Sequence, residues 1–119
     1  MGKGLNNSPA SNTAAVINIG SLGENGVIEL EHLTWSYDGV PASPANIKIE
    51  SPVGTVIYSV DEPSAGIGFD HFSGSGLAGA VGAAMRITAA AGGSGVTCKV
   101  NVIQRMDSQG VPLNKPAGA

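Results

Sequence analysis

The residues best suited to chemistry in this 119-residue chain are its two histidines, His32 and His71. Each follows an acidic residue, Glu31 or Asp70, and a histidine beside a carboxylate is common in acid–base catalysis and in metal sites. A hydrolase would need one histidine and a carboxylate to converge in one cleft. A metal site normally takes three or four protein ligands, and the chain has one cysteine and no Cys-x-x-Cys, His-x-x-x-His or Asp-x-Asp-x-Asp spacing. We therefore predict that both histidines are ordinary strand residues.

The remaining reactive side chains lack the neighbours that catalysis requires. Ser75 lies in a Gly-Ser-Gly run that is shorter than the Gly-x-Ser-x-Gly turn of serine hydrolases. Residues 92–95 (Gly-Gly-Ser-Gly) resemble a phosphate-binding loop in composition, but the Lys-Ser/Thr pair is absent. Cys98 lies on the apolar side of a predicted strand, where a thiol is typically a small buried hydrophobe. We predict no enzyme activity, no cofactor and no metal site.

Trp35 and Tyr37 lie on the same side of another predicted strand. Two aromatic rings on one strand face could form a platform that stacks on a sugar. A single tryptophan in a small β-sandwich is more often the anchor of its core. The burial of Trp35 separates these interpretations, because a platform must be exposed and an anchor must be buried.

Residues 85–103 show the clearest structural pattern in the sequence. Apolar and polar residues alternate on both sides of the glycine-rich run, and the apolar set is Met85, Ile87, Ala89, Val96, Cys98, Val100 and Val102. Such alternation across a glycine-rich connection is typical of a half-buried β-hairpin. We predict that this hairpin buries its apolar side together with Trp35.

Further strands are predicted over residues 14–19, 27–37, 46–50, 55–61 and 67–72, and residues 73–84 form a predicted loop or single helical turn. In the strand 27–37 the apolar residues change sides, which predicts a bulge near Glu31 and His32. About seven short antiparallel strands without a long amphipathic helix indicate an all-β protein, a single β-sandwich of jelly-roll or immunoglobulin-like topology.

The two ends of the sequence differ in composition from its middle. Residues 1–13 are polar and contain asparagine, serine and proline, which predicts an extended N-terminal arm. The sandwich domain is predicted over residues 14–106, and residues 107–119, which contain two prolines, form a predicted C-terminal tail. The N-terminus lacks the apolar segment of a secretory signal.

The overall composition points to a subunit of an assembly. Charged residues make up 13% of the chain, about half the usual share, so little charge repulsion keeps copies apart. The formal net charge is −3 and there is no Lys/Arg cluster, so we expect no nucleic-acid partner. The longest uncharged apolar stretch, 72–85, is short and interrupted by glycines, so we expect no membrane partner.

Several short motifs follow one another along the chain. They are a Trp-Ser-Tyr strand (35–37), a Val-Asp strand end (60–61), a phenylalanine after a glycine bend (66–69) and the segment Ala-Ala-Gly-Gly-Ser-Gly-Val-Thr (90–97). In this order, over roughly residues 27–104, the sequence resembles a group of small proteins encoded in tailed-bacteriophage genomes. The resemblance implies a virion structural protein that decorates the capsid, and it supplies no catalytic residues.

We therefore predict a non-enzymatic bacteriophage protein that is made in the host cytoplasm and decorates the capsid surface. Its expected partners are the major capsid protein or other virion subunits, and further copies of itself in a homo-oligomer such as a trimer. Leu5, Asn6 and Asn7 of the arm are the predicted partner-binding residues, with Leu5 as the only large apolar side chain in residues 2–13. Alternatives are a tail- or fibre-associated structural subunit and a carbohydrate-binding module that uses Trp35 and Tyr37.

Overall fold

The part of the chain that the structure describes is built from nine β-strands without a helix. The computed structural model describes residues 2–72 and 76–105, so the predicted tail 107–119 lies outside the described residues. The strands are β1 (Gly2–Asn7), β2 (Ala15–Ile19), β3 (Glu29–Tyr37), β4 (Ala45–Glu50), β5 (Val56–Glu62), β6 (Gly66–His71), β7 (Leu77–Ala78), β8 (Met85–Ala89) and β9 (Cys98–Arg105).

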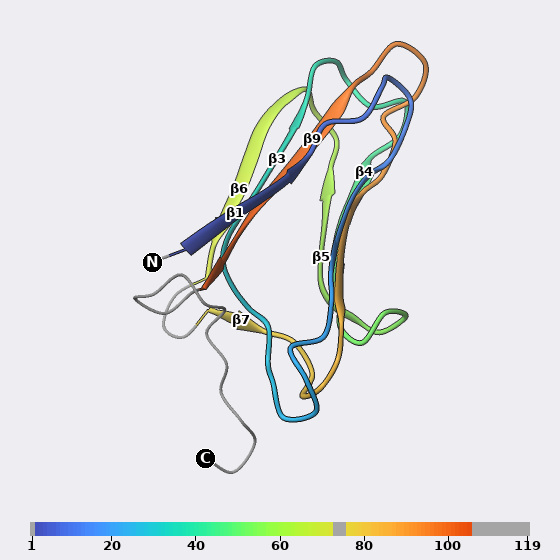
Figure 1. The fold of residues 1–119 in the computed structure, drawn as a ribbon. Helices are drawn as coiled ribbons and strands as arrows, with labels where there is room; N and C mark the ends of the chain where they lie inside the picture. Colours follow the sequence, from blue (N-terminus) through green and yellow to red (C-terminus); the bar gives the residue numbers. More distant parts are fainter. Residues whose placement is uncertain (1, 73–75, 106–119) are drawn as a thin grey trace.

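The strands form two antiparallel sheets that lie face to face (Figure 1). One sheet has the order β1-β9-β3-β6, with the short β7 also paired to β3, and the other has the order β2-β8-β4-β5. Four strand pairs enclose one another in sequence: β4–β5 lies within β3–β6, which lies within β2–β8, which lies within β1–β9. The chain therefore follows one long hairpin that is wound into a sandwich. This arrangement is the jelly-roll topology, and it decides between the two topologies that the sequence left open.

The hairpin predicted over residues 85–103 is wrong, although both of its strands exist. β8 pairs with β2 and β4, whereas β9 pairs with β1 and β3 in the other sheet. The glycine-rich run 92–95 therefore joins the two sheets. Alternation shows which side chains face the core, and β8 and β9 point theirs into the same core from opposite sheets. Alternation does not show which other strand is the hydrogen-bonded neighbour.

Residues 2–7 differ from the predicted N-terminal arm, because they form β1 at the edge of the five-stranded sheet. β1 pairs with β9 so that Leu5 lies opposite Val102 and Asn6 lies opposite Asn101. The side chains of this segment are mostly polar, which favoured an arm. The free edge of β9, however, offers backbone donors and acceptors that bind a strand of almost any sequence.

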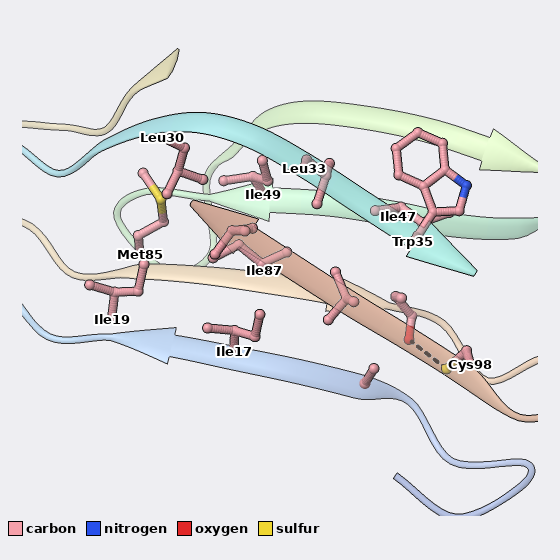
Figure 2. Close-up of a cluster of buried hydrophobic side chains, with 14 of the residues drawn as sticks. Ile17, Ile19, Leu30, Leu33, Trp35, Ile47, Ile49, Met85, Ile87 and Cys98 are labelled. Carbon is pink, nitrogen blue, oxygen red and sulfur yellow. Dashed lines mark hydrogen bonds between the residues drawn. The ribbon is translucent and has the colours of Figure 1, made fainter. Parts of the chain in front are cut away.

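The hydrophobic core lies between the sheets, and apolar side chains from both of them meet there (Figure 2). Trp35, Ile87, Val100 and Val102 are buried in one cluster, which confirms the predicted burial of these four residues. The remaining members come mainly from β2, β3, β4 and β8. Alternating apolar residues thus make the sandwich from aliphatic side chains around a single tryptophan.

The bulge predicted in the third strand is confirmed. The register between β3 and β9 shifts between Leu30 and His32, so Glu31 is the extra residue. Leu30 and Leu33 are three positions apart and would face opposite sides of a regular strand. The extra residue shifts the alternation by one position, so both side chains face the core and are fully buried. Residues 77–78, which were predicted within a loop or helical turn, instead form β7 and pair with Glu29 and Leu30 of β3.

Gly68 of β6 is opposite Trp35, and the indole ring covers it. A Cβ atom at Gly68 would overlap the indole atoms Cε2, Nε1 and Cζ2 well inside van der Waals contact. We expect Gly68→Ala to lower the free energy of unfolding by about 1–3 kcal/mol, since the tryptophan must move within a packed core. Thermal unfolding and the fluorescence of Trp35, the only tryptophan, measure this change.

Gly4→Ala is the matched control for this substitution. Gly4 is also a strand glycine in the same sheet, but nothing lies within 4 Å of a Cβ built there. The control should leave both the melting temperature and the tryptophan emission close to those of the unsubstituted protein. Equal stability of the two variants would show that Trp35 is not packed on Gly68.

Candidate functional site

The structure brings the two histidines together, which the sequence did not predict. His32 of β3 lies directly opposite His71 of β6. Their ring centroids are 4.3 Å apart with planes inclined by 58°, and Nδ1 of His71 is 3.1 Å from both ring nitrogens of His32. His32 is half-buried and His71 is exposed, and both lie on the side of the sheet that faces away from the core.

Asp70, the acidic neighbour of His71, does not join this pair. It lies opposite Leu33, whose side chain faces the core, and its carboxylate accepts a hydrogen bond from the Tyr58 hydroxyl of β5. Burial and this hydrogen bond raise the pKa of Tyr58. Asp70 therefore links the two sheets from the inner side, and it cannot act with His71 as a catalytic pair.

Glu31, the acidic neighbour of His32, is the extra residue of the β3 bulge. Its backbone carbonyl accepts a hydrogen bond from the Phe72 amide at 2.9 Å, which ties the end of β6 to β3. Within residues 2–72 and 76–105, no group of three or more His, Cys, Asp or Glu side chains could hold a metal ion. The structure thus presents two histidines on an open strand surface, without the carboxylate in one cleft that a hydrolase would need.

Trp35 and Tyr37 are buried, with exposed fractions of only 5% and 2%. Trp35 Nε1 donates a hydrogen bond to Glu62 at 2.9 Å, and the Tyr37 hydroxyl donates one to the Ala90 carbonyl at 2.6 Å. Burial also raises the pKa of Tyr37. Since both rings are buried, Trp35 is the core anchor, and Trp35 and Tyr37 do not form the exposed platform that the carbohydrate-binding alternative requires.

The other candidate residues do not form a site. Cys98 is buried as predicted, its Sγ donates a hydrogen bond to the Thr13 carbonyl at 3.3 Å, and burial raises the pKa of the thiol. In the run 92–95, a Cβ at Gly92 would overlap the Val96 side chain, so the glycine there allows a close packing contact. Ser75 lies outside the described residues.

The outer face of the five-stranded sheet carries the histidine pair and an unusual set of neighbours. We use this name for the outward-facing residues Gly4 and Asn6 of β1, Lys99, Asn101, Ile103 and Arg105 of β9, His32, Thr34 and Ser36 of β3, and Ile67, Phe69 and His71 of β6. Lys99 and Arg105 are the only residues in this set with a permanent charge.

Two large apolar side chains stand in solvent on the outer face. Ile67 is 77% exposed and Phe69 is 70% exposed, the two highest values among the large hydrophobic residues that the structure describes. They lie opposite Ser36 and Thr34, which are too small to cover them. Their strand, β6, is an edge strand of its sheet, so its outer backbone groups have no strand partner in the described part of the chain.

A shallow groove of about 320 Å³ adjoins Ile67 at the end of the outer face. Ser36, Lys99 and Asp38 are among its lining residues, and the Asp38 carboxylate also accepts a hydrogen bond from the Thr97 amide at 2.7 Å. This volume is at the small end for ligand pockets. The groove extends the surface around Ile67 and provides polar groups beside it.

The three predicted partner-binding residues fall on different sides of β1. Leu5 faces inward and packs against the core of its own domain, so it is not available as an exposed anchor for a neighbouring subunit. Asn7 lies opposite the buried Val100 and is half-buried. Only Asn6 is exposed, and it lies on the outer face opposite Asn101.

No family model and no curated protein match this sequence. The described residues also contain no helix that is long and apolar enough to cross a membrane. The fold class that the residues define is an all-β jelly-roll sandwich.

The exposed pair Ile67 and Phe69 was the feature that sequence reasoning missed. Its pattern is visible, because Gly66, Ile67, Gly68 and Phe69 alternate small and large residues. Such a strand is normally oriented with its large side chains toward the core. Here the orientation is reversed because Trp35 occupies the space above Gly68, and only a structure shows which strand lies opposite.

Proposed function

We propose that this protein is a non-enzymatic structural component of a bacteriophage virion that binds the head shell through the outer face of its five-stranded sheet. The observation that carries the proposal is the exposure of Ile67 and Phe69 on an edge strand with few charges around it. The sequence resemblance to small virion proteins and the jelly-roll fold, which is common in capsid proteins, support the same role.

The outer face defines the chemistry of a suitable partner. Ile67 and Phe69 require an apolar surface, and the basic residues Lys99 and Arg105 favour a partner with acidic groups around that surface. The free edge of β6 can also accept a further strand by backbone hydrogen bonding. Two apolar side chains and a few polar groups make only a modest contact. Firm attachment therefore requires many copies or a homo-oligomer, in which each added contact acts at high effective concentration.

Sedimentation with capsids tests the proposal. Heads assembled from the phage's major capsid protein without this protein are mixed with it and pelleted. The unsubstituted protein should pellet with the heads, and Ile67→Thr/Phe69→Ser should weaken binding by about 100-fold or more. The physical reason is that burying each large apolar side chain contributes roughly 1.5–3 kcal/mol.

The control is Val40→Ser, because Val40 is 67% exposed in the loop between β3 and β4 and is not one of the outer-face residues. This variant should bind like the unsubstituted protein. If the unsubstituted protein binds isolated tails and not heads, the tail- or fibre-associated alternative is correct. Equal retention of the double variant and the control on heads would show that attachment uses another surface.

A further inference from the structure

The separation of the two imidazoles on the outer face matches that of two ligands on one metal ion. Nδ1 of His71 is 3.1 Å from each ring nitrogen of His32. Metal–nitrogen bonds of about 2.0–2.1 Å place two ligand nitrogens about 3.3 Å apart in tetrahedral geometry and about 2.9 Å apart at adjacent octahedral positions. The observed value lies between these two separations.

An ordinary hydrogen bond explains this geometry less well. A ring N–H or lone pair lies in the plane of its ring and points away from the ring centre. Because Nδ1 of His71 is equally distant from both ring nitrogens of His32, the in-plane lone pair or N–H of neither His32 nitrogen is directed at it. The planes are inclined by 58°, and His71 is exposed, so small ring rotations can aim one lone pair from each histidine at a shared point.

We propose that His32 and His71 together form a binding site for a late first-row divalent transition metal ion such as Zn²⁺, in which water occupies the remaining coordination positions. Imidazole is a preferred ligand of these ions. The register of β3 and β6 holds the two ligands opposite each other before the ion binds, so little ordering is needed. This inference stands apart from the proposed function and differs from the sequence prediction, which expected no metal site because three or four protein ligands are normally needed.

The residues around the histidine pair determine how tightly and how selectively it is expected to bind a metal ion. The neighbours of the pair on the outer face are Thr34 and Phe69 in the next row and Ile103 on β9. Asp70 is engaged on the inner side with Tyr58. Two protein ligands give weaker binding than the four of a closed structural site. Among the described residues no third His, Cys, Asp or Glu side chain forms a metal-binding group with the pair, and a site of two imidazoles disfavours hard cations such as Mg²⁺, which prefer oxygen ligands.

Calorimetric titration of the untagged full-length protein with Zn²⁺ tests the site. We expect saturable binding of one ion per chain, shifts in the NMR signals of both imidazoles and no comparable response to Mg²⁺. The assignment is simple because the chain has only two histidines. His32→Ala and His71→Ala should each abolish saturable binding.

A double variant, His71→Ala/Val40→His, separates geometry from histidine count. It keeps two histidines, but Val40 lies beyond the far end of β3, roughly 16 Å or more from His32 along the strand. It should not bind Zn²⁺, and its melting temperature without metal should match that of His71→Ala. The inference is overturned if the unsubstituted protein shows no saturable binding, or if either single variant or this double variant retains it.

Discussion

Replacing Val100 with aspartate is expected to abolish cooperative folding of the domain. Val100 is fully buried in β9, a central strand, and lies opposite Trp35 on one side and Asn7 of β1 on the other. The variant loses about 1.5–3 kcal/mol of apolar burial and places an unpaired carboxylate in the core, which costs several kcal/mol more. The total approaches the whole stability of an ordinary domain, about 5–15 kcal/mol.

Far-UV circular dichroism, thermal unfolding and gel filtration measure the outcome. Asn101→Asp is the matched control, because Asn101 is the next residue of β9 but is exposed on the outer face. It introduces the same charge and should fold normally. Val100→Ala provides a soluble intermediate case that should lose about 2 kcal/mol. A Val100→Asp variant with an unchanged melting temperature would falsify the assignment of this strand face to the core.

The facing of β3, β8 and β9 could be predicted from the sequence because it follows from local alternation, whereas the facing of β6 could not. Met85, Ile87 and Val100 are buried where the period-two pattern placed them. The bulge was predictable for the same reason, since the change of side between Leu30 and Leu33 requires one extra residue.

Strand pairing could not be predicted in the same way. β8 and β9 follow each other through a glycine-rich connection, as hairpin strands do, yet each pairs with strands far away in the chain. In a jelly roll, most pairs join segments that are distant in sequence, and the hydrophobic pattern of a strand is the same whichever neighbour it has. The polar segment that forms β1 shows the same limit, since its pairing uses backbone groups.

The candidate site depends entirely on this non-local pairing. His32 and His71 are separated by 39 positions, and only the register of β3 with β6 makes them neighbours. That register also places Trp35 over Gly68, and in this way it turns Ile67 and Phe69 to solvent. The metal-ligand pair and the apolar surface therefore have one structural cause.

Deleting residues 2–7 is expected to destabilise the isolated domain. The deletion removes β1, takes the half-buried Leu5 from the core and leaves β9 as an open edge. The backbone hydrogen bonds lost are largely offset by the entropy of the six residues that no longer need ordering. The net change then comes from lost apolar burial, about 2–4 kcal/mol, and corresponds to a fall in melting temperature on the order of 10 °C.

Two point variants separate the parts of this effect. Leu5→Ala keeps the strand and removes only the inward side chain, so it should account for much of the loss, whereas Asn6→Ala changes an exposed residue on the outer face and should be neutral. An unchanged melting temperature in the deletion variant would mean that residues 2–7 act as the arm that the sequence suggested, and that β9 needs no partner on this side. If the deletion variant loses stability as expected, weaker binding to capsids has two explanations: β1 contacts the particle, or the damaged sheet alters the outer face. Leu5→Ala distinguishes them, because it destabilises the sheet but keeps β1.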